Sequence, residues 1–184
     1  MKRVFDVVLS CVALIVLSPL LLLAAVAVLV DSGPPILFRQ TRVGLGGREF
    51  RMLKFRSMVT NAASIGPYHT ASGDPRITPV GAVLRRSSID ELPQLLNVLR
   101  GDMILVGPRP DVPDQRRLYS EGDWAQRCSV RPGITGLAQA LLRSQATPAE
   151  RLALDLRYAS EHSVWLDIRI LGWSVGRLSG KGSN

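Results

Sequence analysis

VFDVVLSCVALIVLSPLLLLAAVAVLV, residues 4–30, is an almost continuously apolar stretch. As one straight helix it would be roughly 40 Å long, enough to cross the about 30 Å of hydrocarbon in a bilayer. Pro19, however, removes one backbone hydrogen bond and clashes with the preceding turn, so we expect a kink at Ser18-Pro19. The arms on either side, Val4 to Leu17 and Leu20 to Val30, would be about 21 Å and about 16 Å long, and neither crosses a bilayer alone.

Basic residues flank this stretch on both sides. Lys2 and Arg3 precede it, and a group of cations follows it: Arg39, Arg42, Arg48, Arg51, Lys54 and Arg56. Because Lys and Arg are enriched in cytoplasmic segments, the pattern fits a re-entrant helix–break–helix whose two ends both stay on the cytoplasmic side. A simple crossing with the N-terminus outside also satisfies the heavier downstream charge. The residues alone leave both arrangements open.

Composition narrows the classes of partner. The chain has 184 residues, which fits one compact domain, and a formal net charge of +8, which favours phosphorylated small molecules, acidic lipid headgroups or nucleic acid. Only 5% of the residues are aromatic, so a stacking platform for single-stranded nucleic acid is poorly supported and no nucleic-acid partner is expected. Cys11 and Cys128 do not make a disulfide framework, and the chain shows no zinc-ligand spacing.

A β-hairpin is expected directly after the apolar stretch. Residues 36–40 and 49–55 are strand-like, and the turn between them contains Gly44, Gly46 and Gly47. The glycines could instead cradle a phosphate, but a lone glycine-rich turn is weak evidence, so the hairpin is favoured.

Further along, a loop and three helices are expected. Residues 61–79 are rich in Gly, Pro, Ser and Thr and predict a mobile loop, in which His69 is interpreted as solvated. One helix is expected to start at Asp90 or Glu91 and to run to Arg100, followed by Gly101. A capping-box pattern at Thr147 opens a helix to about residue 160, and Ser163 caps another over 164–178.

The helix over 164–178 carries an amphipathic pattern. Its aromatic, aliphatic and basic residues are typical of a helix that lies at a membrane interface: Trp165, Ile168, Arg169, Trp173 and Arg177. Ordinary packing onto a soluble core explains the same pattern almost as well.

The most informative stretch runs from Arg85 to Pro110. Asp90 and Glu91 open the expected helix, where free N–H groups and the helix dipole favour negative charge. An ionised carboxylate is a competent nucleophile toward phosphorus, and phosphate substrates usually bring Mg²⁺ held by one or two carboxylates. Arg85 and Arg109 supply planar, permanently charged forks that suit phosphate oxygens.

A purely structural explanation of the acid pair is available. Ser88 and Glu91 have the spacing of a capping box, and Asp90 would then only favour the helix dipole. Taken alone, two acids at a helix start are more often caps than catalysts.

The sequence resembles the membrane-monotopic phosphoglycosyl transferases, which are bacterial sugar transferases that begin glycoconjugate assembly. The similarity extends in order over nearly the whole chain, and the number and spacing of its blocks make it specific. The blocks are Lys2-Arg3-Val4-Phe5-Asp6, Phe38-Arg39-Gln40 to Gly47, Lys54-Phe55-Arg56-Ser57-Met58, Asp74-Pro75-Arg76-Ile77-Thr78, Asp90 to Gln94, Gly107 to Pro110 and Arg131-Pro132-Gly133-Ile134-Thr135-Gly136.

The resemblance implies an α-rich α+β, membrane-monotopic fold with a small β-hairpin and interfacial amphipathic helices. Residues 1–32 would form a re-entrant membrane helix broken at Ser18-Pro19, and residues 33–184 a catalytic domain. Both termini and the active site would lie on the cytoplasmic face of a bacterial inner membrane.

The resemblance also implies a two-step reaction. Asp90 would attack the phosphate that carries the sugar of a nucleotide diphosphate sugar, usually a uridine diphosphate sugar, and polyprenyl phosphate would then take the phosphosugar. Mg²⁺ would sit on Asp90 and the diphosphate, with Glu91 supporting the acid pair. The residues expected to bind substrate phosphate are Arg85, Arg109, Lys54 and Arg56.

Two departures from the family pattern bear on the donor. Leu137 stands where family members commonly have Trp, and Leu141-Leu142 replaces a common Asn-Gly. The sequence therefore does not define the sugar, nor does it define the polyprenol, the pathway or the oligomeric state. Two other functions remain as alternatives: a membrane-tethered basic module that binds anionic lipid or nucleic acid, and a phosphohydrolase with the same aspartyl intermediate.

Overall fold

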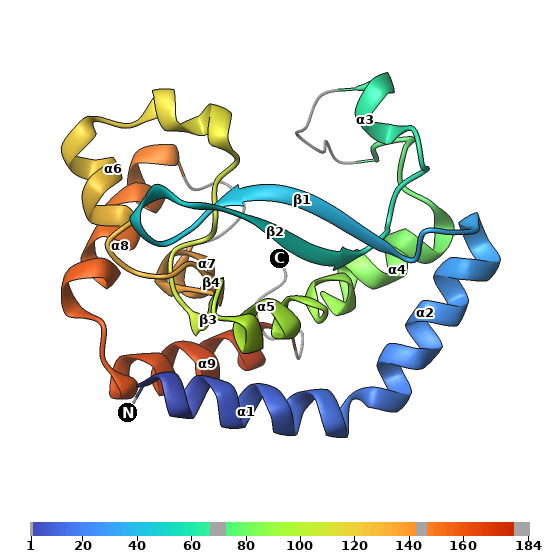
Figure 1. Ribbon diagram of the computed structural model, residues 1–184, viewed down its shortest axis with the longest axis horizontal. Helices are drawn as coiled ribbons and strands as arrows, with labels where there is room; N and C mark the ends of the chain where they lie inside the picture. The colour runs from blue at the N-terminus through green and yellow to red at the C-terminus, as the bar shows by residue number, and fades with distance from the viewer. Residues whose placement is uncertain (1, 67–72, 143–146, 179–184) are drawn as a thin grey trace.

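The computed structural model describes residues 2–66, 73–142 and 147–178 (Figure 1). Helices predominate, as expected: α1 (Lys2–Val16), α2 (Ser18–Ser32), α3 (Ala62–Ile65), α4 (Pro79–Arg86), α5 (Gln94–Arg100), α6 (Glu121–Arg127), α7 (Leu137–Leu141), α8 (Pro148–Glu161) and α9 (Val164–Leu178). The strands are β1 (Leu37–Val43), β2 (Glu49–Phe55), β3 (Ile104–Val106) and β4 (Gly133–Thr135), and 3₁₀ turns cover Leu45–Gly47 (η1), Ile89–Glu91 (η2) and Pro113–Leu118 (η3).

The expected kink in the apolar stretch is confirmed. Helices α1 and α2 meet at a bend of 64°, visible at the lower right of Figure 1. Pro19 has no N–H to offer the carbonyl group of Ile15, and the Ser18 hydroxyl donates to that carbonyl instead, at 2.8 Å. In the described part of the chain no single helix is long and apolar enough to cross a membrane, whereas the bent pair together has the length and composition.

Helix α1 is fastened to the rest of the protein by the polar residues at its start. Arg3 donates to two carbonyl groups at the end of α5, at 2.7 and 3.1 Å. The buried carboxylate of Asp6 accepts from a backbone N–H of β3, and Lys2 forms an ion pair of 2.7 Å with Asp167 of α9. The Lys2 ammonium group also donates to the hydroxyl of Tyr158, which is fully buried in α8. The predicted division of the chain at residue 32 stays a prediction.

Two small sheets connect these helices. Strands β1 and β2 pair antiparallel with Leu37 opposite Phe55 and Val43 opposite Glu49, which confirms the hairpin. Strands β3 and β4 pair in parallel, which the sequence did not predict because each strand is only three residues long. Their close approach depends on Gly133, since a Cβ at that position would lie 2.0 Å from the backbone nitrogen of Gly107.

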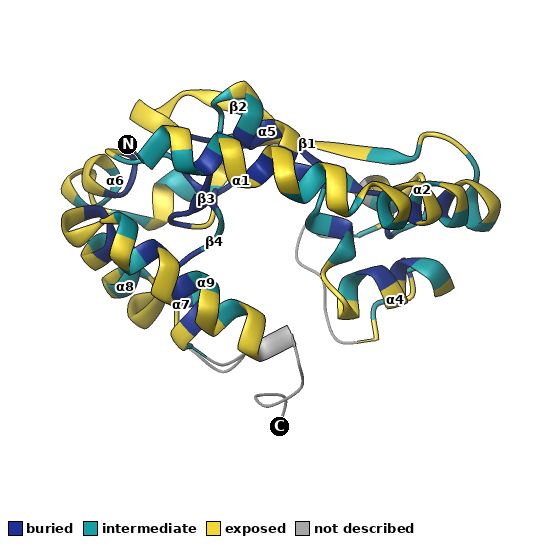
Figure 2. Ribbon diagram, turned by 90° about the horizontal axis from the view of Figure 1, so that it is seen from below, coloured by how far each residue is buried: buried dark blue, intermediate teal, exposed yellow. Residues whose placement is uncertain are grey.

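The core has two parts. The larger cluster joins α1, α5, β3, α8 and α9 around Val98, Met103 and Tyr158, and the smaller one joins α2, α4 and β2 around Val28, Phe55 and Leu84. Outside the core, α1, α4 and α9 present many exposed residues on the face that Figure 2 shows from below.

The helix expected to start at Asp90 or Glu91 begins later. Residues 89–91 form the 3₁₀ turn η2, and α5 begins at Gln94. An α-helix through this region would need the residue at position 93 to donate to the carbonyl of Ile89, and Pro93 has no N–H. Leu92 donates to Ile89 instead, in the shorter 3₁₀ pattern.

The expected loop over 61–79 contains more structure than predicted. Ala62–Ile65 forms α3, Ile77 bridges to Met58, and Pro79 is the first residue of α4. The described residues on either side of 67–72 are therefore held by defined contacts, and the mobility of the loop stays a prediction. His69 lies outside the described residues.

Both C-terminal helices are confirmed. The Thr147–Glu150 capping box opens α8, and the Ser163 hydroxyl accepts from the N–H of Leu166 at the start of α9. Helix α9 has one face in the core, where Ile170 is fully buried, and another in the open, where Trp165 is 77% exposed. The side chain of Arg177 lies outside the described part of the structure.

Candidate active site

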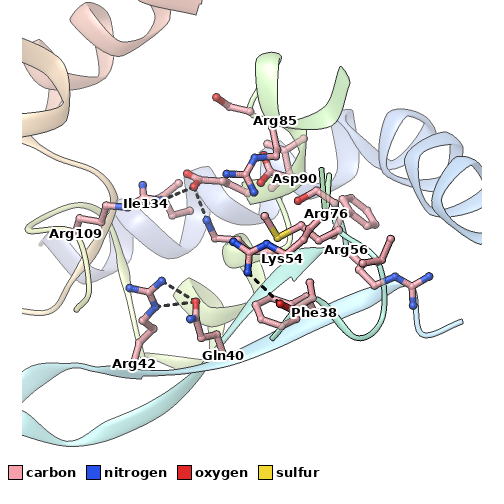
Figure 3. A pocket seen from close by; sticks show the side chains of 18 of the residues that line it. Phe38, Gln40, Arg42, Lys54, Arg56, Arg76, Arg85, Asp90, Arg109 and Ile134 are labelled. Atoms are coloured by element: carbon pink, nitrogen blue, oxygen red, sulfur yellow. Dashed lines mark hydrogen bonds and ion pairs between the residues drawn. The ribbon is translucent and has the colours of Figure 1, made fainter. Parts of the chain in front are cut away.

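A cavity of about 770 Å³ lies between the β1–β2 hairpin, η2 and the C-terminal end of β4 (Figure 3). It collects side chains from segments that are far apart in the sequence. All of the residues predicted to form the site line it: Lys54, Arg56, Arg85, Asp90, Glu91 and Arg109. The structure therefore brings the predicted residues together at one cavity, and their roles in the reaction stay a prediction.

Three different elements bring the cations to the cavity. Lys54 projects from β2, Arg85 lies in the last turn of α4, and Arg109 follows β3. Helix α4 can lie against the chain beyond β2 because Gly81 has no side chain. A Cβ at position 81 would stand 2.1 Å from the carbonyl oxygen of Ser57.

The acid pair sits on a tight backbone turn. Ser88 adopts the left-handed conformation with φ 57°, and η2 follows directly. The Ser88 side chain makes no capping hydrogen bond, and the Glu91 N–H instead donates to the backbone carbonyl of Ser88. The capping-box explanation of Asp90 and Glu91 is therefore wrong, and both side chains face the cavity.

Glu91 gathers two cations on one oxygen atom. Its Oε1 accepts from Lys54 Nζ at 2.6 Å and from Arg109 Nη2 at 2.7 Å. Burial alone would raise the pKa of Glu91, but the charges and hydrogen bonds of Arg109 and Lys54 outweigh it and lower the pKa to about 2. Glu91 is therefore an ionised carboxylate that holds both cations in position.

Asp90 is the opposite case. It is 7% exposed, and no residue that the structure describes donates a hydrogen bond to its carboxylate or forms an ion pair with it. Burial raises the pKa of Asp90, and the negative charge of Glu91 adds to that effect, while Lys54, Arg85 and Arg109 act in the opposite direction. A poorly solvated carboxylate without hydrogen-bond donors keeps its lone pairs available for a substrate or a metal ion.

The three cations differ in how many of their hydrogen-bond donors are already used within the protein. The pKa of Lys54 is lowered by burial, and the ion pair with Glu91 offsets this only in part. The Arg109 side chain is half-exposed, and the charge of Glu91 raises its pKa. Arg85 makes no hydrogen bond or ion pair with any described residue, although it lines the cavity next to Asp90 (Figure 3). Arg85 and the outer edge of Arg109 can thus receive an anion.

Arg56 makes structural contacts that the sequence did not predict. Its Nη2 donates to the carbonyl oxygen and the hydroxyl of Ser32, both at 2.8 Å, and to the carbonyl oxygen of Gly33. Arg56 therefore holds the C-terminal end of α2 against β2, where the helix dipole is negative. Its assignment to substrate phosphate stays a prediction.

Sequence reasoning missed several residues that line the cavity. Arg42 donates to the side-chain oxygen of Gln40 and to the carbonyl oxygen of Pro110, at 2.7 and 2.8 Å (Figure 3). The remaining ones include Arg76, Thr135, Gln139 and Ser174. The Asp74–Ile77 and Arg131–Gly136 blocks signalled two of them through the family resemblance, whereas Ser174 had no signal in the sequence.

The loop that carries Arg109 is held by a buried arginine outside the cavity. Arg127 donates to the Arg109 carbonyl oxygen at 2.6 Å and forms ion pairs with Asp111 and Asp155. On the other side, the N–H of Val43 donates to the carbonyl oxygen of Asp111. The position of Arg109 is therefore fixed from both ends of its loop.

Mg²⁺ is the metal that the family resemblance implies. Among the described residues no group of three His, Cys, Asp or Glu side chains could hold a metal ion without help. Mg²⁺, however, is commonly bound through one or two carboxylates together with substrate phosphates and water. The unengaged oxygens of Asp90 fit that kind of site, whereas Glu91 is occupied by two cations.

The cavity therefore combines a free carboxylate with a cluster of cations, and comparison with known proteins agrees with this chemistry. A family model described as bacterial sugar transferase matches residues 1–180. The chain belongs to this family. It is 48% identical over 92% of its length to a UDP-glucose:undecaprenyl-phosphate glucose-1-phosphate transferase of Caulobacter vibrioides. It is 44% identical over 99% of its length to the exopolysaccharide production protein PSS of Rhizobium leguminosarum bv. phaseoli.

A third relative has a name that gives another sugar than that of the Caulobacter protein. It is a UDP-N-acetylgalactosamine-undecaprenyl-phosphate N-acetylgalactosaminephosphotransferase of Aeromonas hydrophila, and it is 41% identical over 92% of this chain. The chain spans 66% of the Caulobacter protein and 41% of the Aeromonas protein, but 98% of the Rhizobium protein.

Replacing the two acids one at a time should change the free energy of unfolding in different ways. Asp90→Asn removes a buried charge that has no hydrogen-bond donor, so the free energy of unfolding at pH 7 should stay unchanged or rise. Glu91→Gln leaves Lys54 and Arg109 without their counter-charge and should cost about 1–3 kcal/mol. Thermal unfolding of the two variants in detergent measures the difference. Equal losses in both would contradict the contrast drawn between the two carboxylates.

Proposed function

We propose that this member of the bacterial sugar transferase family transfers a phosphosugar from a UDP-sugar to polyprenyl phosphate, with Asp90 as the nucleophile. The supporting observation is the contrast within the acid pair. The ionised Glu91 is paired with two cations, whereas the Asp90 carboxylate faces the same cavity and no described residue donates a hydrogen bond to it. A nucleophile needs an available lone pair, and among the described residues neither oxygen of Asp90 has a donor, whereas Glu91 is held by two cations through its Oε1.

In the first step an Asp90 oxygen attacks the phosphorus atom that carries the sugar. A bond forms between that oxygen and phosphorus, and the bond from phosphorus to the bridging oxygen of the diphosphate breaks. Uridine monophosphate leaves with the electron pair, and the phosphosugar remains as an ester of Asp90. Arg85 and Arg109 lie where they can hold the phosphate oxygens and balance the negative charge that moves to the leaving group.

In the second step a phosphate oxygen of polyprenyl phosphate attacks the same phosphorus. The bond to Asp90 breaks, the carboxylate is restored, and polyprenyl-diphosphate-sugar is the product. Lys54, fixed by Glu91, lies in the cavity to stabilise the anions of both steps. Bound Mg²⁺ would neutralise diphosphate charge, and Asp90 is the residue that fits as its protein ligand.

The proposed substrates rest on the relatives. The Caulobacter and Aeromonas proteins are named for UDP-sugar donors and undecaprenyl phosphate, and the Rhizobium protein is named for exopolysaccharide production. These two relatives are 48% and 41% identical to this chain, and their names give different sugars. Their similarity therefore supports a uridine diphosphate donor and leaves the sugar open.

The proposed location is the cytoplasmic face of the bacterial inner membrane, with α1 and α2 re-entrant. The bent helix pair supports this, because its two arms are each too short to cross. Helices α1, α4 and α9 face the viewer in Figure 2, and each carries exposed apolar residues: Val8, Val12 and Ile15 of α1, Val83 of α4, and Trp165, Ile168 and Val175 of α9. Such a surface fits the interface of a bilayer.

The reaction predicts a covalent intermediate. Purified protein given a UDP-sugar and Mg²⁺ without lipid should gain the mass of one phosphosugar on Asp90, and polyprenyl phosphate should discharge it with release of uridine monophosphate. Asp90→Asn should lower kcat by roughly a thousandfold or more. Intact-protein mass spectrometry and nucleotide release measure both effects.

The matched control is Asp114→Asn, at an exposed acid outside the cavity, which should leave the rate unchanged. Full activity of Asp90→Asn would remove the nucleophile assignment. Release of free sugar phosphate without lipid would favour a phosphohydrolase, and salt-dependent binding of lipid or nucleic acid without turnover would favour a basic binding module.

The raised pKa of Asp90 predicts the acid side of the pH profile. Because the carboxylate takes up its proton above the ordinary value of about 3.9, kcat/KM should fall as the pH drops through a higher value. Arg85→Gln removes a charge that lowers the pKa of Asp90, so the fall should move to still higher pH. Arg86→Gln, at an exposed neighbour outside the cavity, is the control. A shift to lower pH in Arg85→Gln would contradict this electrostatic assignment.

The re-entrant arrangement predicts that both termini lie on one side of the membrane. Peptide tags fused to either end should be protected from protease in spheroplasts and digested in inverted membrane vesicles. Digestion of the N-terminal tag in spheroplasts would instead show a simple crossing.

A further inference from the structure

The cavity has two walls of different chemistry. The wall formed by the hairpin and the chain beyond it contains apolar side chains beside its cations: Phe38, Met58, Val59 and Ala62. The wall formed by β4, α7 and α9 presents uncharged side chains, of which Ile134 is apolar and three are polar: Thr135, Gln139 and Ser174. Uncharged polar groups are the natural partners of neutral hydroxyl groups, whereas phosphates select the cations between the walls.

Strand pairing places Thr135 beside the loop that carries Arg109. Thr135 lies opposite Val106 in the parallel pair β3–β4, and its carbonyl oxygen accepts from the N–H of Gly107 at 2.8 Å. Gly136 follows, where a Cβ would stand 2.2 Å from the carbonyl oxygen of Gly107. Thr135 is thus fixed one strand away, about 4.8 Å, from the start of the segment that leads to Arg109.

The hydroxyl groups of this wall have a defined hydrogen-bond direction. Ser174 Oγ donates to the carbonyl oxygen of Ile170 at 2.8 Å, which uses its single hydrogen atom. Ser174 Oγ and Thr135 Oγ1 are 2.8 Å apart, and with the Ser174 hydrogen on the Ile170 carbonyl we assign Thr135 as the donor of that bond. Both hydroxyl hydrogens are then used, and Thr135 Oγ1 retains lone pairs only. Toward the cavity, Thr135 Oγ1 can therefore accept a hydrogen bond but cannot donate one.

We propose that Thr135, held by Ser174, is a specificity-determining residue that accepts a hydrogen bond from one hydroxyl group of the donor sugar. This inference rests on the proposed function and adds the location and polarity of the sugar subsite. The sugar is bonded directly to the phosphate that Arg109 would hold, whereas the nucleobase is separated from it by a second phosphate and a ribose. A wall rooted next to the Arg109 loop therefore meets the sugar first.

Leu137 and Leu141, where the sequence departs from the family pattern, do not line the cavity. Leu137 is buried in the larger core cluster, and Leu141 is exposed outside the cavity. From β4 to α7, the side chains that line the cavity are those of Ile134, Thr135 and Gln139. The polar contacts available to a sugar from this segment therefore come from Thr135 and Gln139, whereas Leu137 acts on packing.

The test compares hydroxyl-bearing and deoxy donors in a Thr135→Val variant, which keeps the shape of the side chain. The best donor is first chosen among UDP-glucose, UDP-galactose and their two N-acetyl forms, and its monodeoxy derivatives are then assayed by release of uridine monophosphate. Thr135→Val should lower kcat/KM about three- to tenfold with the parent donor. With one particular monodeoxy donor, wild type and variant should be equal, because neither can form the bond.

Two controls separate recognition from folding. Thr135→Ser retains the oxygen atom and should restore discrimination between the parent and that deoxy donor. Thr41→Val, at an exposed strand position outside the cavity, should change nothing. UDP without a sugar should inhibit wild type and Thr135→Val with the same Ki. An equal loss with every donor, or a matching loss in UDP affinity, would overturn the sugar assignment.

The hydrogen assignment has its own test. Ser174→Ala frees the Thr135 hydrogen, so Thr135 can then donate to a fluorine atom at the recognised position. The ratio of kcat/KM for the deoxyfluoro donor to that for the deoxy donor should rise about threefold or more over wild type. An unchanged ratio contradicts the inferred direction. Absence of nucleotide release from wild type with all four donors would instead contradict the proposed function itself.

Discussion

One carboxylate oxygen organises the active-site region of this protein. Glu91 Oε1 draws Lys54 from the hairpin and Arg109 from the loop after β3 to within 2.7 Å, and so joins parts of the chain that share no secondary structure. Removing either cation would leave the partly buried Glu91 carboxylate with less compensation for its charge. The same arrangement leaves the adjacent Asp90 without a partner. In the proposed reaction, Asp90 would be the reactive carboxylate, and Glu91 would hold the cations beside it.

The bent helix pair is tied at both ends to the elements that carry the site. At the start of α1, Arg3 caps the end of α5, whose chain continues from the turn that carries Asp90. At the end of α2, Arg56 of the segment after β2 caps the helix, one residue beyond Phe55 and two beyond Lys54. Cations at helix C-termini are favourable because the dipole is negative there. The geometry of the cavity thus depends on the same contacts that hold the apolar helices.

The sequence predicted what local rules determine. The kink at Ser18-Pro19, the hairpin over 36–55 and the capped helices from Thr147 follow from proline, glycine and capping chemistry, and each is confirmed. Short elements held by distant contacts escaped prediction: α4 lies against Ser57 because of Gly81, and the parallel pair β3–β4 is three residues long. The residues predicted through the family resemblance line one cavity, whereas the contacts that distinguish Asp90 from Glu91 and the Thr135–Ser174 pair exist only after folding.

The hydrogen bond from Ser18 to the Ile15 carbonyl has a consequence for insertion depth. A proline break normally leaves a carbonyl group that seeks water, and in hydrocarbon an unsatisfied group of this kind costs several kcal/mol. Here the serine next to the proline satisfies that carbonyl from within the chain. The Ile15 carbonyl therefore does not draw the elbow toward either surface of a bilayer. In the proposed re-entrant arrangement, the depth of the elbow would be set by the lengths of the two arms and by the cations at their ends, so the fold would tolerate bilayers of different thickness.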